Sequence, residues 1–230
     1  MALATDARET VVLLHGLART ARSMSRLEQA LTSAGYAVCN VSYPSRVFRV
    51  ERLVADYIVP AVRACSAGSV APVHFVTHSL GGILVRQLAA TEASLRIGRV
   101  VMLAPPNGGS EVVDKLGSSP LLKQVFRWVN GPAGGQLGTG ANDLPRALGA
   151  ATFEVGVIAG RRSVNLWLST LIVGDDDGKV SVENTRLAGM KDFLVLPVSH
   201  PFVMRNGEAI AQTIRFLADG RFAHHSANAP

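Results

Sequence analysis

The stretch Thr77-His78-Ser79-Leu80-Gly81-Gly82 decides how this chain is interpreted. It follows a run of strand character at 72–76, and it opens an apolar pattern of helical period that continues to Leu88. A serine on a sharp strand-to-helix turn is a nucleophile elbow, which needs small residues two before and two after the serine. Gly81 meets this need fully, and Thr77 meets it in part. An ordinary serine N-cap would give a similar pattern, so the rest of the chain must decide.

Composition favours one globular α/β domain. The chain has 230 residues, of which 48% are hydrophobic and 17% are charged, and this length is enough for a full core. The net charge is +6, but the basic residues are scattered, so we expect no nucleic-acid partner. We see neither a signal peptide nor an apolar stretch of membrane-spanning length, and we therefore expect a cytoplasmic protein with no stable membrane insertion.

The two cysteines and the acidic turn raise the question of disulfide and metal sites. Cys39 and Cys65 do not have a metal-binding spacing, and two cysteines are too few for a disulfide framework. We interpret both as buried thiols, which suits a reducing compartment. The turn Asp175-Asp176-Asp177 lacks the alternating spacing of a calcium loop, so we expect no metal.

Strand and helix patterns alternate along the chain, which predicts a mostly parallel sheet flanked by helices on both faces. Strands are expected at 11–14, 37–43, 72–76, 99–104, 153–159 and 192–198. Helices are expected at 24–34, 50–58, 80–88 and 208–217, with Pro60 ending or kinking the second of them.

Residues 110–150 interrupt this alternation. Two helical patches, 111–116 and 121–129, precede a glycine-rich loop at 131–140. We interpret 110–150 as a small cap or lid over the carboxyl edge of the sheet; plain connecting helices with a surface loop fit as well. The expected organisation is one domain over 1–220, followed by a disordered tail over 221–230.

Two further residues of a nucleophile–acid–base set follow Ser79 in the chain. His200 directly follows the last expected strand, and the acidic turn precedes it. The carboxyl ends of parallel strands share one edge of a sheet, so these groups are expected to meet there. Asp177 is the preferred acid because Gly178 lets the backbone turn sharply behind it; Asp176 remains the alternative.

The remaining histidines are given no part in the chemistry. We expect His74 to be buried with its hydrogen bonds satisfied and His78 to pack next to the nucleophile. His224 and His225 fall in the expected tail, where we assign them no role.

His15-Gly16-Leu17 ends the first expected strand and suits an oxyanion hole. Acyl transfer needs two backbone N–H groups that face the developing negative charge. We expect one from Leu80, directly after the serine, and the other from Leu17. Gly16 would allow the close approach that this requires.

With these motifs in this order, the chain from about Thr10 to about Leu217 resembles the bacterial lipase/esterase branch of the α/β-hydrolase superfamily. The resemblance implies an α/β-hydrolase fold, with Ser79 as nucleophile, His200 as base and the aspartate of Asp177-Gly178-Lys179-Val180 as acid. It also implies Leu17 and Leu80 as oxyanion donors, supported by His15, Gly16 and Gly81. Thr77 and the small cap depart from the usual pattern.

The expected activity is cleavage of a small-molecule ester or lipid through an acyl-serine intermediate, without a cofactor. An acyltransferase or an amidase could use the same residues. A catalytically inactive scaffold that serves as a binding module is a further alternative. The small cap predicts a preference for short- to medium-chain esters.

Overall fold

The computed structural model describes residues 8–67, 69–117, 130–163 and 175–224. Six strands form one sheet in the order β2-β1-β3-β4-β5-β6, and every neighbouring pair is parallel. The predicted sheet of parallel strands is therefore confirmed. The strands are β1 (Thr10–Leu14), β2 (Ala37–Val41), β3 (Val73–His78), β4 (Ile97–Leu103), β5 (Val155–Gly160) and β6 (Asp192–Leu196).

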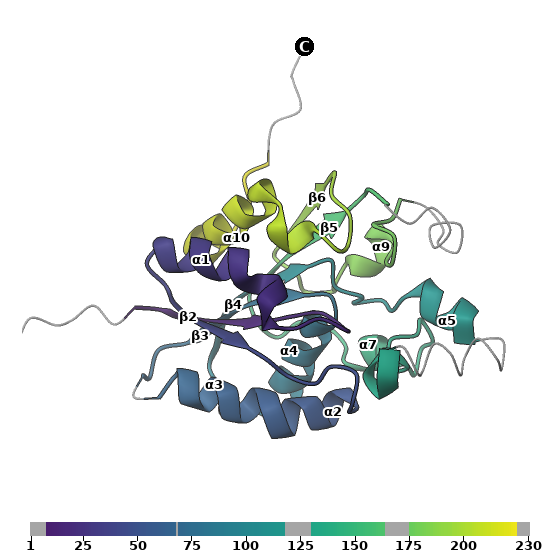
Figure 1. Cartoon of the computed structure of the whole chain (residues 1–230), viewed down its shortest axis with the longest axis horizontal. Helices are drawn as coiled ribbons and strands as arrows, with labels where there is room; N and C mark the ends of the chain where they lie inside the picture. Colours follow the sequence, from purple (N-terminus) through teal and green to yellow (C-terminus); the bar gives the residue numbers. More distant parts are fainter. Residues whose placement is uncertain (1–7, 68, 118–129, 164–174, 225–230) are drawn as a thin grey trace, which may run out of the picture.

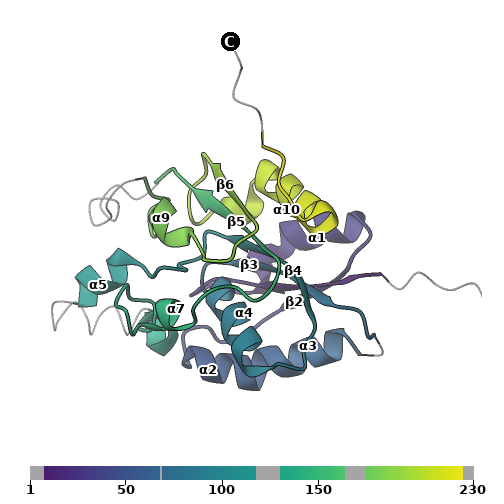
Figure 2. The same cartoon turned by 180° about the vertical axis from the view of Figure 1, so that it is seen from behind.

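Helices cover both faces of the sheet, as predicted (Figures 1 and 2). One face carries η1 (Ala21–Met24), α1 (Ser25–Ser33), η3 (Val203–Arg205) and α10 (Gly207–Asp219). The other carries α2 (Val50–Leu53), η2 (Val54–Ile58), α3 (Val59–Cys65) and α4 (Leu80–Thr91). Short helices lie beyond the carboxyl ends of the strands: α5 (Glu111–Gly117), α7 (Leu144–Ala147) and α9 (Val182–Thr185).

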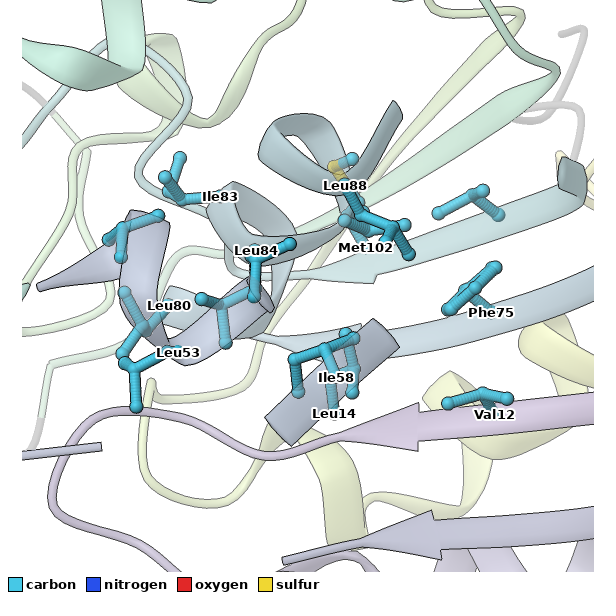
Figure 3. Packing of buried hydrophobic residues seen from close by; sticks show 14 of the residues in the cluster. Val12, Leu14, Leu53, Ile58, Phe75, Leu80, Ile83, Leu84, Leu88 and Met102 are labelled. Atoms are coloured by element: carbon cyan, nitrogen blue, oxygen red, sulfur yellow. The ribbon is translucent and has the colours of Figure 1, made fainter. Parts of the chain in front are cut away.

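Strand β1 shows why the sequence folds into three layers. Its side chains alternate between faces, so Val12 and Leu14 pack with α2, η2 and α4 (Figure 3), whereas Val11 and Leu13 pack with α1 and α10. All four are fully buried. A strand covered on both faces reads as a continuous apolar run, and burying each such side chain contributes about 2 kcal/mol.

The helix before β3 differs from the prediction at Pro60. The helical backbone continues past this proline to Cys65, and Pro60 lies in the first turn of α3. The preceding segment, η2, is a π-helix. A widened turn gives room for the proline ring, which would otherwise clash with a carbonyl one turn earlier.

The glycine-rich loop predicted at 131–140 begins later than expected, because residues 130–134 are helical. Gly131 has a φ of +67°, and a Cβ built there would lie 1.8 Å from the carbonyl oxygen of Arg46. This close approach explains the glycine. Composition alone indicated a loop because it does not reveal such a tertiary contact.

The interpretation of the cysteines as buried thiols was wrong. Cys39 on β2 and Cys65 at the end of α3 form a disulfide, with their Cα atoms 6.2 Å apart. Both residues are half-buried. The inference of a reducing compartment loses its basis, because it rested on free thiols; the pairing depends on how α3 returns beside the edge strand, which spacing does not show.

The tail predicted from Arg221 does not hold for residues 221–224. Phe222 is buried against Phe216 of α10, with ring centroids 5.0 Å apart. Its N–H donates to Asp192 Oδ2, and His224 Nε2 lies 2.8 Å from Asp192 Oδ1. One large apolar side chain therefore anchors a segment whose composition resembles a tail, and His225 lies outside the described residues.

The cap region is described only in part. Helices α5 and α7 lie at the carboxyl edge of the sheet (Figures 1 and 2), as the cap interpretation requires, whereas the helix predicted at 121–129 falls outside the described residues. Mobility of a lid stays a prediction. Within the part of the chain that the structure describes, no helix has the length and apolar character needed to cross a membrane.

Candidate active site

Ser79 occupies a one-residue turn between β3, which ends at His78, and α4, which begins at Leu80. Its backbone has φ 51° and ψ −118°, a strained conformation for a residue with a side chain. Gly81 is required here because a Cβ would lie 2.5 Å from the Leu14 carbonyl oxygen. Thr77 is fully buried in β3, so threonine fits at this position. The geometry is that of a nucleophile elbow.

Hydrogen bonds link Ser79, His200 and Asp177 in one chain. His200 Nε2 lies 3.0 Å from Ser79 Oγ, and His200 Nδ1 lies 2.7 Å from Asp177 Oδ2. Asp177 is fully buried, and its Oδ1 accepts hydrogen bonds from the N–H groups of Lys179 and Val180. The backbone N–H of His200 also donates to the Asp177 carbonyl, which holds the two loops together.

The other two aspartates of the acidic turn point elsewhere. Asp175 is exposed, and Asp176 Oδ1 accepts from the N–H of Gly178 at 2.6 Å. Asp177, rather than its neighbours, therefore meets His200. Gly178 has a φ of +99°, which a residue with a side chain rarely adopts, and this matches the sharp turn expected there.

The turn after β1 lies directly against Ser79. A Cβ on Gly16 would come within 2.7 Å of His78 Nδ1 and 3.2 Å of Ser79 Cβ, so only glycine fits. The N–H of Arg19 donates to the Gly16 carbonyl at 3.2 Å, which places Leu17 and Ala18 in the middle of the turn. Leu17 therefore lies in the turn that contacts Ser79, directly after Gly16, but its role as a hydrogen-bond donor remains a prediction.

Leu80 is the first residue of α4. Backbone N–H groups in the first turn of a helix have no intrahelical acceptor, so this N–H is available to a ligand beside Ser79. This is the property that an oxyanion donor needs.

His15 stiffens the base of the same turn. Its ring stacks on Tyr43 with centroids 3.9 Å apart, and the Tyr43 hydroxyl donates to the His15 carbonyl oxygen. His15 is fully buried, and this burial lowers the pKa of its imidazole. A neutral, stacked ring supports the turn without adding charge to it.

His78, which precedes Ser79, bonds to the backbone of His200, and this is more than the packing role predicted. Its Nε2–H donates to the carbonyl oxygen of His200 at 3.0 Å, and the two rings lie 5.0 Å apart. Burial lowers the pKa of His78 well below its ordinary value, and the neighbouring His200 lowers it further. Neutral His78 with its proton on Nε2 therefore anchors the loop that carries His200.

Arg86 links α4 to the loops around the site, and the sequence did not lead us to expect this role. It is buried on α4, and its guanidinium donates to Asn107 and to the carbonyl oxygens of Pro145 and Gly149. Asn107 in turn donates to the Thr185 carbonyl of α9, just beyond the acidic turn. Burial lowers the pKa of Arg86 to about 10. The sequence did hold one sign of this burial: Arg86 comes three residues after Ile83 and therefore lies on the apolar side of α4.

Comparison with known proteins identifies the family. A model described as "Alpha/beta hydrolase family" matches residues 11–213, which is most of the chain. The chain belongs to the alpha/beta hydrolase family. A search of curated proteins finds no match to this hydrolase.

Solved structures with the same fold include lipases and esterases. A Bacillus licheniformis lipase, BlEst2, in its mature form is 20% identical over 92% of this hydrolase and 93% of the lipase, with a TM-score of 0.71. The phospholipase PlaB of Legionella pneumophila is 19% identical over 94% of this chain, with a TM-score of 0.71, but only 60% of PlaB is covered. A metagenomic carboxyl esterase, MGS0156, is 21% identical over 86% of this chain and 66% of its own, with a TM-score of 0.67. At these identities the likeness concerns the fold.

Proposed function

We propose that this hydrolase cleaves carboxylic esters through an acyl-serine intermediate formed on Ser79. The observation that carries the proposal is the chain of hydrogen bonds from Ser79 Oγ through the His200 ring to buried Asp177. A serine hydroxyl is a weak nucleophile until a base accepts its proton. The strained backbone of Ser79 and the lipase and esterase folds among the neighbours support the same proposal.

The first half of the reaction forms the acyl-enzyme. His200 Nε2 takes the proton from Ser79 Oγ while the oxygen attacks the ester carbon, and the carbonyl electrons move onto the ester oxygen. The N–H groups of Leu17 and Leu80 stabilise this oxyanion. The bond to the alcohol oxygen then breaks, and the alcohol leaves with the proton from His200.

Water completes the cycle. His200 takes a proton from water as it attacks the acyl carbon, and then returns that proton to Ser79 as the carboxylic acid is released. Asp177 holds the imidazole in the required tautomer and stabilises its positive charge at both stages. The chain's own residues supply every group that this scheme needs.

The experiment is ester hydrolysis by wild type and Ser79→Ala on p-nitrophenyl esters of increasing acyl length. We expect Ser79→Ala to lower kcat by about 10³- to 10⁶-fold with an unchanged circular dichroism spectrum. Retained hydrolysis by the purified variant would overturn the assignment. Product analysis with an added alcohol tests the acyltransferase alternative in the same assay, and the matching p-nitroanilides test the amidase alternative.

A further inference from the structure

Two cationic side chains lie on the turns that carry the proposed catalytic groups. Arg19 closes the turn in which Gly16 lies against Ser79, through its N–H bond to the Gly16 carbonyl. Lys179 lies on the acidic turn, and its N–H donates to Asp177 Oδ1 at 3.0 Å. One cationic residue thus lies on the turn that contacts Ser79 and the other on the turn that carries Asp177, on segments far apart in the sequence.

Neither cation has a carboxylate partner among the described residues, where every ion pair joins other side chains. Both residues reach the surface, although the surrounding loops shield the Lys179 ammonium from much of the solvent. Asp177 is the nearest acid by position, but its carboxylate already accepts from two backbone N–H groups and from His200. Its carboxylate is engaged in the site, so among the described residues neither cation has an ion-pair partner of its own.

The charges also act on each other and on the site. Desolvation by the surrounding loops lowers the pKa of the Lys179 ammonium, the Arg19 guanidinium lowers it further, and Asp177 raises it. Behind burial and His200, both cations lower the pKa of His78, which adjoins Ser79. Both cations therefore add positive potential at the same site, which the two turns form together.

We propose that the natural ester carries an anionic oxygen group, a carboxylate or a phosphate, which Arg19 and Lys179 bind while Ser79 attacks the ester carbon. This rests on the function proposed above and names its substrate class. A guanidinium presents a planar fork to such a group, and an ammonium adds a compact point charge. An anion bound between the two side chains would compensate their positive charges. It would also reduce the repulsion between them.

The test compares matched esters. The butyryl ester of 4-hydroxybenzoate carries a carboxylate, the butyryl ester of 4-hydroxybenzyl phosphate carries a phosphate, and the butyryl ester of methyl 4-hydroxybenzoate is neutral. For each enzyme variant, kcat/KM for an anionic ester is divided by kcat/KM for the neutral ester. Comparing this ratio between variants cancels the intrinsic reactivity of the esters, and the two anionic arms tell carboxylate from phosphate.

Arg19→Gln and Lys179→Gln should each lower the ratio about tenfold for the preferred anion, as expected for loss of a charge-assisted hydrogen bond. The double variant should lower it further. Lys179→Arg, which keeps the charge, should retain most of the preference. Arg63→Gln removes a charge on α3, where Arg63 pairs with Glu92, and should leave the ratio as in wild type. Raising the salt concentration should reduce the wild-type ratio.

A wild-type ratio that none of the variants changes would overturn this inference. An equal loss of activity on all three esters would also overturn it, because it would assign the cations to the reaction's own oxyanion. Either result leaves ester cleavage by Ser79 standing. Absence of hydrolysis of every ester by wild type would instead overturn the proposed function itself.

Discussion

Different interactions hold the two halves of the site in place. The nucleophile half, residues 15–19 and 77–82, is held by close backbone approaches that only glycine permits, with Gly16 against Ser79 and Gly81 against Leu14. The acid–base half, residues 175–181 and 199–202, is held by hydrogen bonds that converge on Asp177. Steric fit is intolerant of a single added carbon, whereas a polar network is sensitive to the loss of one charge or acceptor.

Besides the hydrogen bond between Ser79 and His200, two connections link these halves or the helices next to them. One is short, from the ring of His78, which precedes Ser79 in the chain, to the His200 carbonyl. The other is longer and runs from Arg86 on α4, the helix that follows Ser79, through Asn107 to Thr185 on α9, the helix that follows the acidic turn. We expect the first to matter for pH dependence and the second for stability, and the changes below separate these contributions.

The largest effect should come from the acid–base half. Asp177→Asn removes the carboxylate that orients His200, and we expect kcat to fall by up to about 10⁴-fold. The neighbouring Asp176→Asn is the matched control; it alters a half-exposed side chain and should change kcat by less than about tenfold. Steady-state kinetics on one p-nitrophenyl ester measures both. If Asp176→Asn were the crippling change, the acid would be misassigned by one residue.

In the nucleophile half, Gly16→Ala should lower kcat about 10²-fold. The new Cβ would press on the His78 ring and on Ser79, and it would displace the turn proposed to supply an N–H group to the oxyanion. Gly207→Ala is the control, because a Cβ there meets no atom within 4 Å. Matching kcat values for the two variants would show that the turn after β1 does not contribute to the reaction.

Local motifs explain why the nucleophile half was predictable and the connections were not. The turn at Ser79 and the glycines at 16 and 81 follow from steric rules that act over a few residues, so the sequence displays them. The meeting of His200 with Asp177 was predictable from chain order and from the shared edge of a parallel sheet. Contacts between distant segments cannot be predicted from the spacing of residues in the sequence. The bonds of Arg86, the Cys39–Cys65 disulfide and the packing of Phe222 are contacts of this kind.

Removing the longer connection should cost stability more than activity. Arg86→Met keeps the length of the side chain but leaves Asn107 and the carbonyls of Pro145 and Gly149 without their donor. Buried acceptors without donors cost about 1–3 kcal/mol, and we expect the free energy of unfolding to fall by about 2 kcal/mol in urea titrations. Arg215→Met, at an exposed pair with Asp219, should cost less than about 1 kcal/mol. Equal losses would refute a special role for Arg86.

The shorter connection, through His78, should make the free energy of unfolding depend on pH. The pKa of His78 is lowered in the folded chain from 6.5, chiefly by burial, so the unfolded chain binds protons more readily. Stability from this group is therefore complete above pH 6.5 and declines as the pH falls below it, by up to about 1.4 kcal/mol per pH unit. Burial lowers the pKa of His15 and His74 as well, so wild type must be compared with His78→Gln.

Urea titrations between pH 7.5 and 5 make this comparison. His78→Gln can still donate to the His200 carbonyl but does not titrate, and its stability should fall less steeply with acid than that of wild type. Parallel curves would mean that His78 does not control this part of the pH response.

The central claim is that Ser79 is the residue activated by His200. The most direct measurement is covalent labelling with a fluorophosphonate followed by peptide mass spectrometry. We expect one adduct on wild type, located on Ser79, and no adduct on Ser79→Ala at the same reagent concentration. An adduct on another serine, or undiminished labelling of Ser79→Ala, would contradict the account.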